Sequence, residues 1–214
     1  VKVAVAAAYL SQVDHGRRSL DDRIGGRTAR QLIEVMLIRS DNPATDLLIR
    51  DLGGPQAVQT WISWNGLTNI RVDRTIAQLL RDRRDLWDVR DSSTPVAMVA
   101  LLRQLDRGNV LKPESRQYLL DTMARCATGR NRIRGLLAPG TPVAHKTGTL
   151  NGLTTDVGYI TLPTGRRIAV AFFARGGNDR PRAIAEAART IYDGLVARLW
   201  RVGSVPVGAT ASAY

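Results

Sequence analysis

The sequence predicts a two-lobed α/β protein in which a mainly helical region precedes an antiparallel sheet. Two observations lead to this prediction. From residue 1 to residue 140, apolar residues recur at helical spacing between turn residues, whereas from residue 141 they alternate along strand-like segments. The 214 residues, 44% hydrophobic and 23% charged, are typical of a folded chain that forms one domain or two lobes sharing a core.

Helix signals mark six segments of the region over residues 1–140. Residues 2–14 are Ala-rich and apolar almost all round, which indicates a buried helix that ends near Gly16. Thr28 is a candidate N-cap for the second helix. The remaining helices are expected over 44–52 and 55–64, after Ser93-Thr94-Pro95 and after Lys112-Pro113-Glu114. Residues 21–27 and 73–91 are interpreted as loops.

The region over residues 141–200 is expected to form the second lobe. Its segments PVAHKTGTL, DVGYITL and RRIAVAFFA are β-branched or alternating, and Pro163-Thr164-Gly165 joins the last two as a hairpin. Short connections make neighbouring antiparallel strands the expected arrangement. An amphipathic helix over 180–200 closes the lobe, and the small residues of 201–214 predict a flexible tail.

Composition excludes several classes of function. The net charge is +12, but arginines are scattered and their densest cluster, around Arg81, is interleaved with aspartates. Because no nucleic-acid module accompanies that charge, we expect no nucleic-acid partner. Cys126 is the only cysteine, so an intrachain disulfide is excluded, and His15 and His145 are too few for a histidine-based metal site. No apolar run could span a bilayer, so stable membrane insertion is not expected.

Lysine placement provides the first chemical signal, since only three of the 31 basic residues are lysines. Lys2 lies in an apolar helix, where partial desolvation would lower its pKa and allow its amine to accept a proton. Arginine could not do this, because it stays protonated. Two further signals are Ser40-Asp41-Asn42 at a helix junction and Lys146-Thr147-Gly148 in a strand. Taken singly, each also fits an ordinary turn or a lysine that reaches solvent.

Together, and in this order, these segments resemble the class A β-lactamases and related penicillin-recognising serine hydrolases, whose signature is S-x-x-K, S-D-N and K-T-G. The similarity runs over nearly the whole chain, including SDNPATDLLIRDLGGP and ATGRNRIRGLLAPGTPVAHKTGT. It implies a β-lactamase-like fold, serine acyl transfer without metal or organic cofactor, and a β-lactam or acyl-peptide substrate. It also implies a monomer that resides in the bacterial periplasm or is secreted.

The resemblance assigns a role to each matching residue. Lys2 would take or shuttle the proton of the nucleophile, Ser40 would relay it to the departing nitrogen, and Asn42 would hold the substrate's acylamide. Asp41 is expected to fix the turn. Lys146 would supply positive potential, and the substrate carboxylate would be bound by Thr147, Thr149 and Arg132 next to Gly148. The backbone N–H of Thr149 would form half of an oxyanion hole.

The start of the chain departs from the family pattern. If Lys2 is the lysine of S-x-x-K, the serine belongs two residues before Val1, and we expect the native polypeptide to include it. The interval from Lys2 to Ser40 is also shorter than in familiar members, with the loss around Ile24-Gly25-Gly26. The alternative is a truncated, non-catalytic paralogue.

The loop over residues 73–91 departs from the pattern too. Class A members carry a glutamate there that activates the deacylating water, but the only glutamates are Glu34, Glu114 and Glu186. Arg74 and Asp91 could clamp the neck of the loop. The sequence therefore predicts a β-lactamase-like enzyme with slow deacylation. A penicillin-binding D-Ala-D-Ala peptidase or an esterase-like relative is the other catalytic alternative.

Overall fold

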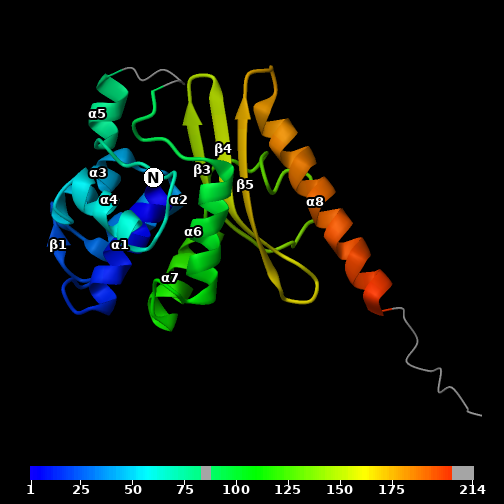
Figure 1. Cartoon of the computed structure of the whole chain (residues 1–214), viewed down its shortest axis with the longest axis horizontal. Coiled ribbons are helices and arrows are strands. Elements are labelled where there is room, and N and C mark those ends of the chain that lie inside the picture. Colours follow the sequence, from blue (N-terminus) through cyan, green and yellow to red (C-terminus); the bar gives the residue numbers. More distant parts are fainter. Residues whose placement is uncertain (83–87, 204–214) are drawn as a thin grey trace, which may run out of the picture.

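The computed structural model describes residues 1–82 and 88–203, so residues 204–214 of the tail expected over 201–214 lie outside the described residues. Helices occupy most of the first part, and three strands and a long helix follow (Figure 1). In chain order the elements are α1 (Lys2–Asp14), β1 (Arg23–Ile24), β2 (Arg27–Thr28), α2 (Ala29–Ile38), α3 (Asn42–Asp51), α4 (Pro55–Trp64), α5 (Ile76–Arg81), α6 (Pro95–Arg107), α7 (Pro113–Ala124), β3 (Val143–Leu150), β4 (Leu153–Thr161), β5 (Arg167–Arg175) and α8 (Arg180–Gly203).

Local capping chemistry accounts for several helix starts. Thr28 accepts a hydrogen bond from the backbone of Gln31, whose side chain bonds back to Thr28, so α2 begins with a capping box. Asp41 caps α3 in the structural role expected for it, with its carboxylate accepting from Ala44 N–H at 2.7 Å. This cap starts α3 at Asn42, two residues before the start expected from periodicity. Thr94 caps α6 with proline at the first turn.

Three further segments differ from the sequence prediction. Residues 76–81, interpreted as part of the loop over 73–91, form helix α5, because Thr75 and Gln78 start it with a capping box. Residues 23, 24 and 27, interpreted as loop, belong with Thr28 to the two-residue strands β1 and β2, which pair antiparallel around Gly25-Gly26. Both glycines have positive φ, which makes the tight turn possible. The closing helix α8 continues to Gly203 rather than ending at residue 200, the boundary we expected for the flexible tail.

The sheet has the strand order β3-β4-β5 and is antiparallel throughout. Cross-strand partners share a face, so Lys146 lies on the same face as its partner Val157, and His145 and Thr147 lie on the other. Figure 1 shows α8 covering one face of the sheet, while the helical lobe lies on the opposite side. The face that carries Lys146 therefore turns towards the helical lobe.

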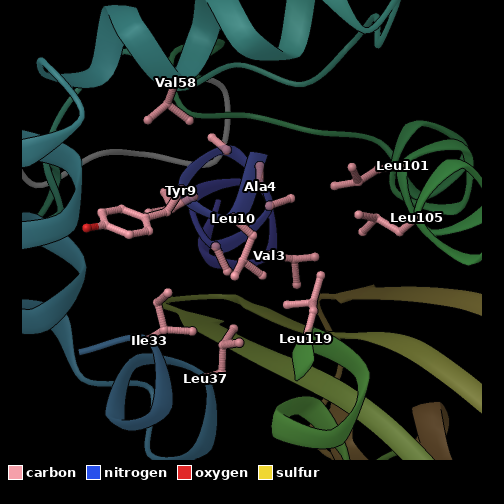
Figure 2. Packing of buried hydrophobic residues seen from close by; sticks show 14 of the residues in the cluster. Val3, Ala4, Tyr9, Leu10, Ile33, Leu37, Val58, Leu101, Leu105 and Leu119 are labelled. Carbon is pink, nitrogen blue, oxygen red and sulfur yellow. The ribbon is translucent and has the colours of Figure 1, made fainter. Parts of the chain in front are cut away.

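Helix α1 runs through the centre of the helical lobe, and Figure 2 shows apolar side chains from several helices surrounding it. Val3 to Leu10 are at most 2% exposed, so the helix is buried on every side, as its composition predicts. The same hydrophobic cluster reaches Val157 and Tyr159 of the sheet. A second cluster between the other sheet face and α8 includes Ile160 and Ile184. The continuous first core holds α1 at a fixed position relative to β3.

Candidate active site

Lys2, at the start of α1, is held by the junction between α2 and α3. Its amine donates to the carbonyl of Ser40 at 2.5 Å, to the Ser40 hydroxyl at 3.1 Å and to Oδ1 of Asn42 at 2.7 Å. Burial, reinforced by the positive charge of Lys146, lowers the pKa of Lys2 to about 8. The geometry therefore offers a titratable amine in direct contact with a hydroxyl.

Ser40 has an unusual backbone conformation. Its φ is +61°, in the left-handed region that non-glycine residues seldom adopt. The residue lies between the last turn of α2 and Asp41, which caps α3, so the chain reverses sharply there. This turn directs both the carbonyl and the hydroxyl of Ser40 to Lys2. A strained residue held in this way is typical of a functional site.

Lys146, in β3, approaches the same region from the sheet. It is only 4% exposed, and its amine donates to the carbonyl of Thr147 at 2.8 Å and lies 3.4 Å from the Thr147 hydroxyl. Burial lowers its pKa to about 8, although the charges of Cys126 and Asp156 oppose that shift. The two lysines therefore have similarly lowered pKa values, but Lys2 is half-buried, Lys146 is buried, and their partners differ.

A cavity of about 280 Å³ lies between the residues around Lys2 and those around Lys146. The expected residues that line it are Lys2, Ser40, Asn42, Lys146, Thr147, Gly148 and Thr149. Residues 2, 40–42 and 146–149, far apart in the sequence, are thus assembled in one place. A Cβ atom on Gly148 would lie 2.5 Å from the Thr155 hydroxyl, so that position in the cavity wall favours glycine.

Arg132 braces the strand rather than lying on the surface. Its Nη1 donates to the carbonyls of Gly148 at 2.9 Å and Thr155 at 2.8 Å, and its Nη2 donates to the Thr149 hydroxyl at 2.7 Å. Its Nε is buried and is the one buried side-chain polar atom without a partner among the described residues. Arg132 is not among the described residues that line the cavity, but it donates hydrogen bonds to three that are, Gly148, Thr149 and Thr155.

The neck of the loop over residues 73–91 contains the ion pair expected between Arg74 and Asp91, at 2.7 Å. Arg74 also reaches Asp82 at 2.8 Å and Asp88 at 3.1 Å, so one nearly buried guanidinium binds three carboxylates. Asp91 additionally accepts from the backbone N–H groups of residues 73 and 74. Its oxygens are therefore committed to holding the loop. A further aspartate of this loop, Asp85, lies outside the described residues.

Sequence reasoning missed part of the cavity wall. Ile76, Leu79 and Leu80 of α5 line it, and Leu80 is 53% exposed. The sequence signal for α5 is the T-x-x-Q pattern of Thr75 and Gln78, which forms the capping box at the start of the helix. Thr128 was also missed, although its hydroxyl lies 2.5 Å from that of Thr147. Its contact depends on long-range packing and leaves no local sequence pattern.

Across residues 1–82 and 88–203, no three histidine, cysteine, aspartate or glutamate side chains are grouped to hold a metal ion. Among the helices of that same part of the chain, none combines the length and apolar character needed to cross a bilayer.

Comparisons with known proteins place this arrangement in a family. A model of the "Beta-lactamase enzyme family" matches residues 1–195. β-Lactamase VEB-1 of Pseudomonas aeruginosa is 31% identical over 205 residues, which cover 81% of this chain and 67% of that protein. A β-lactamase of Mycobacterium tuberculosis is 38% identical over 177 residues, which cover 78% of this chain and 57% of that protein. The chain thus spans about three fifths to two thirds of the length of these relatives.

Solved structures agree. The TLA-1 extended-spectrum β-lactamase superimposes with a TM-score of 0.82 at 30% identity, covering 91% of this chain and 82% of that chain. An ancestral class A β-lactamase has a TM-score of 0.84 at 33% identity, covering 90% of this chain and 83% of that one. The chain therefore belongs to the β-lactamase enzyme family, as a class A serine β-lactamase-like hydrolase.

Proposed function

We propose that the protein opens β-lactam amides through an acyl-enzyme, with a nucleophilic serine two residues before Val1. The observation that carries the proposal is the contact of Lys2 with Ser40. An amine with a pKa near 8 is neutral in a useful fraction of molecules at neutral pH, so it can accept the serine proton. The Ser40 hydroxyl, 3.1 Å from that amine, can pass the proton to the departing nitrogen.

The sheet side of the cavity would bind the charged end of the substrate. A β-lactam carboxylate near Thr147 and Thr149 would meet their hydroxyls and the positive potential of Lys146. Arg132, which already donates to the Thr149 hydroxyl, would strengthen that positive region. Asn42 would donate its amide N–H group to the acylamide, because its Oδ1 is occupied by Lys2. No metal or organic cofactor enters this mechanism.

Deacylation is proposed to be slow. The loop over residues 73–91 has no glutamate, and its start presents Ile76 and Leu79 to the cavity. The one carboxylate among the described lining residues, Asp91, is bound to Arg74 and to two backbone N–H groups. A water on the acyl-enzyme would lack a free base, and a misplacement of about 1 Å can lower a rate about a hundredfold.

A single kinetic experiment tests this function. Benzylpenicillin mixed with protein carrying the proposed serine should lose one equivalent of intact β-lactam ring in a burst, as the acyl-enzyme forms, and slow turnover should follow. Mass spectrometry should detect the penicilloyl adduct on that serine. Fast steady-state hydrolysis without a burst, retained after substitution of Asp82, Asp85 and Asp88, would show that another group activates the water.

The apolar cavity wall formed by α5 also supports a second candidate function. An enzyme that acylates and retains its acyl group could serve as a penicillin-binding D-Ala-D-Ala peptidase or an esterase-like hydrolase. Release of D-alanine from an acyl-D-Ala-D-Ala peptide, at a rate above that of penicillin turnover, would favour this candidate. A protein without the serine would be a non-catalytic paralogue that binds β-lactams reversibly. A monomeric state and a periplasmic or secreted location remain proposals carried by the family resemblance.

A further inference from the structure

Asp156 is a fully buried carboxylate in β4 that no step of the proposed mechanism uses. It is 0% exposed, and its oxygens lie 2.8 and 3.0 Å from Nδ1 of His145. One of them also accepts from the backbone N–H of Ile133 at 3.2 Å. A buried carboxylate needs such donors to compensate for lost hydration, so these contacts determine how its surroundings pack.

His145, also 0% exposed, connects Asp156 to the strand that carries Lys146. Its register partner on β4 is Gly158. A Cβ atom on Gly158 would lie 2.1 Å from the Ala144 carbonyl and 2.9 Å from Cβ of His145. Only glycine permits this close approach. The other ring nitrogen of His145, Nε2, accepts from Nε of Arg134 at 3.2 Å, which places the ring hydrogen on Nδ1, facing Asp156.

Three consecutive residues of the segment before β3 are therefore fastened to the sheet. Arg132 donates to Gly148, Thr155 and Thr149, Ile133 donates to Asp156, and Arg134 donates to His145. Arg134 also donates to the carbonyls of Ala124 and Val143. The contacts of residues 133 and 134 converge on one buried pair, and the contacts of residue 132 lie at the cavity edge.

We propose that His145 and Asp156 are positioning residues that hold Arg132 against the strand Lys146–Thr149 and so set the affinity for the substrate carboxylate. This inference rests on the proposed role of Arg132 in carboxylate binding. Without the Nδ1–H group, Asp156 would lose its hydrogen bond to His145 and keep the one from the N–H of Ile133, and the segment around residue 133 would rearrange to solvate the carboxylate. Because Arg132 is the adjacent residue, its guanidinium would move with that segment.

The test compares two substitutions of His145 in the 214-residue chain. His145→Asn keeps an N–H donor near the position of Nδ1, whereas His145→Leu removes it at similar volume. Calorimetry gives the dissociation constants of benzylpenicillin and of its methyl ester, at a temperature where circular dichroism shows each variant folded. Wild-type protein should prefer the carboxylate about tenfold, as one charge-assisted hydrogen bond allows. His145→Leu should reduce the preference to about twofold or less, and His145→Asn should retain most of it.

The ratio of the dissociation constants of the methyl ester and of benzylpenicillin distinguishes positioning from simple stabilisation. If His145 had a purely structural role, its replacement would lower the melting temperature without changing this ratio in the folded protein. An unchanged ratio in His145→Leu overturns the inference. His15→Leu, at the only other histidine, is the matched control and should leave the ratio unchanged. If His145→Leu does not fold, Asp156→Asn replaces it, because the amide removes the negative charge that holds the two N–H groups and places an NH2 group at one of the two oxygen positions.

A second measurement separates this inference from the proposed function. Labelling with phenylglyoxal, followed by peptide mass mapping, reports the accessibility of Arg132 without any ligand. The rate at Arg132 should rise severalfold in His145→Leu and little in His145→Asn, while that at Arg167 stays constant. Absence of penicillin binding in wild-type protein would contradict the proposed function, and the labelling would then decide the positioning role by itself. An unchanged rate at Arg132 overturns that role.

Discussion

The two lysines of the site, one in each lobe, have similarly lowered pKa values but different surroundings. Lys2, half-buried in the helical lobe, donates to three oxygens of residues 40 and 42. Lys146, buried in the sheet, contacts two oxygens of its neighbour Thr147. Burial lowers the pKa of both to about 8. The partners therefore distinguish the two proposed roles. Lys2 contacts the hydroxyl of Ser40, with which it could exchange a proton, whereas Lys146 contacts its own strand and would act as a positive charge.

The largest expected effect comes from removing the amine on the helical side. Lys2→Met, in protein carrying the proposed serine, should lower the rate of acylation by benzylpenicillin by about 10²–10⁴-fold, the usual contribution of a positioned base. Stopped-flow kinetics measure this rate. Lys2→Arg is the control, because it keeps the charge and cannot deprotonate. Near-normal acylation in either variant would contradict the role of Lys2 as base.

The loop neck provides a purely structural contrast. Arg74→Met should lower the free energy of unfolding by about 3 kcal/mol, because Asp91, whose side chain is 1% exposed, would lose its charged partner. Denaturant titration measures the change. Arg71→Met, which breaks the exposed pair with Asp73, should lower the free energy of unfolding much less, because solvent screens that pair. Equal losses in the two variants would show that the three-carboxylate cluster adds no stability.

On the sheet side, Arg132→Ala should weaken binding of carboxylate-bearing ligands by about 1.5–3 kcal/mol, since it removes a charged donor beside Thr149. Calorimetry with benzylpenicillin measures the change. The exposed neighbour Arg130 supplies the control, and Arg130→Ala should leave affinity unchanged. An unaltered dissociation constant in Arg132→Ala would restrict Arg132 to bracing Gly148 and Thr155.

The smallest expected effect is a pH dependence, whose sign is opposite for the acylation rate on the Lys2 side and for the carboxylate affinity on the Lys146 side. Acylation should rise as Lys2 loses its proton towards pH 8, whereas carboxylate affinity should fall by about tenfold from pH 7 to pH 9 as Lys146 becomes neutral. Because the lysines interact, the apparent pKa values belong to the pair. An affinity independent of pH over this range would show that the charge of Lys146 does not attract the ligand.

The same shifts affect stability. The folded-state pKa of each lysine lies below its ordinary value of 10.5. Between pH 8 and 10.5 the unfolded chain therefore binds more protons, and the contribution of these lysines to the free energy of unfolding rises with pH. Below pH 8 each buried amine is charged in both states, and its desolvation cost is fully present. Lys2→Met should accordingly flatten the rise.

Local sequence determined the helix starts, the strand order and the identity of the motif residues. Thr28, Asp41 and Thr94 cap helices through bonds that span three residues, so a short stretch contains all the information needed. Alternation along β3 likewise puts Lys146 and Gly148 on one face. The rarity of lysine among the basic residues indicated where a titratable amine would matter.

Only the tertiary structure decided which groups share the site and which hold it. The fastening of Arg132, the addition of Asp82 and Asp88 to the expected pair of Arg74 and Asp91, and the apolar wall of α5 depend on contacts between segments that lie apart in the chain. The pair of His145 and Asp156 follows from strand register and from the glycine beside the ring. Such contacts require long loops to close and buried charges to be paired. The free energies of both processes depend on the whole fold, so no local sequence pattern predicts them.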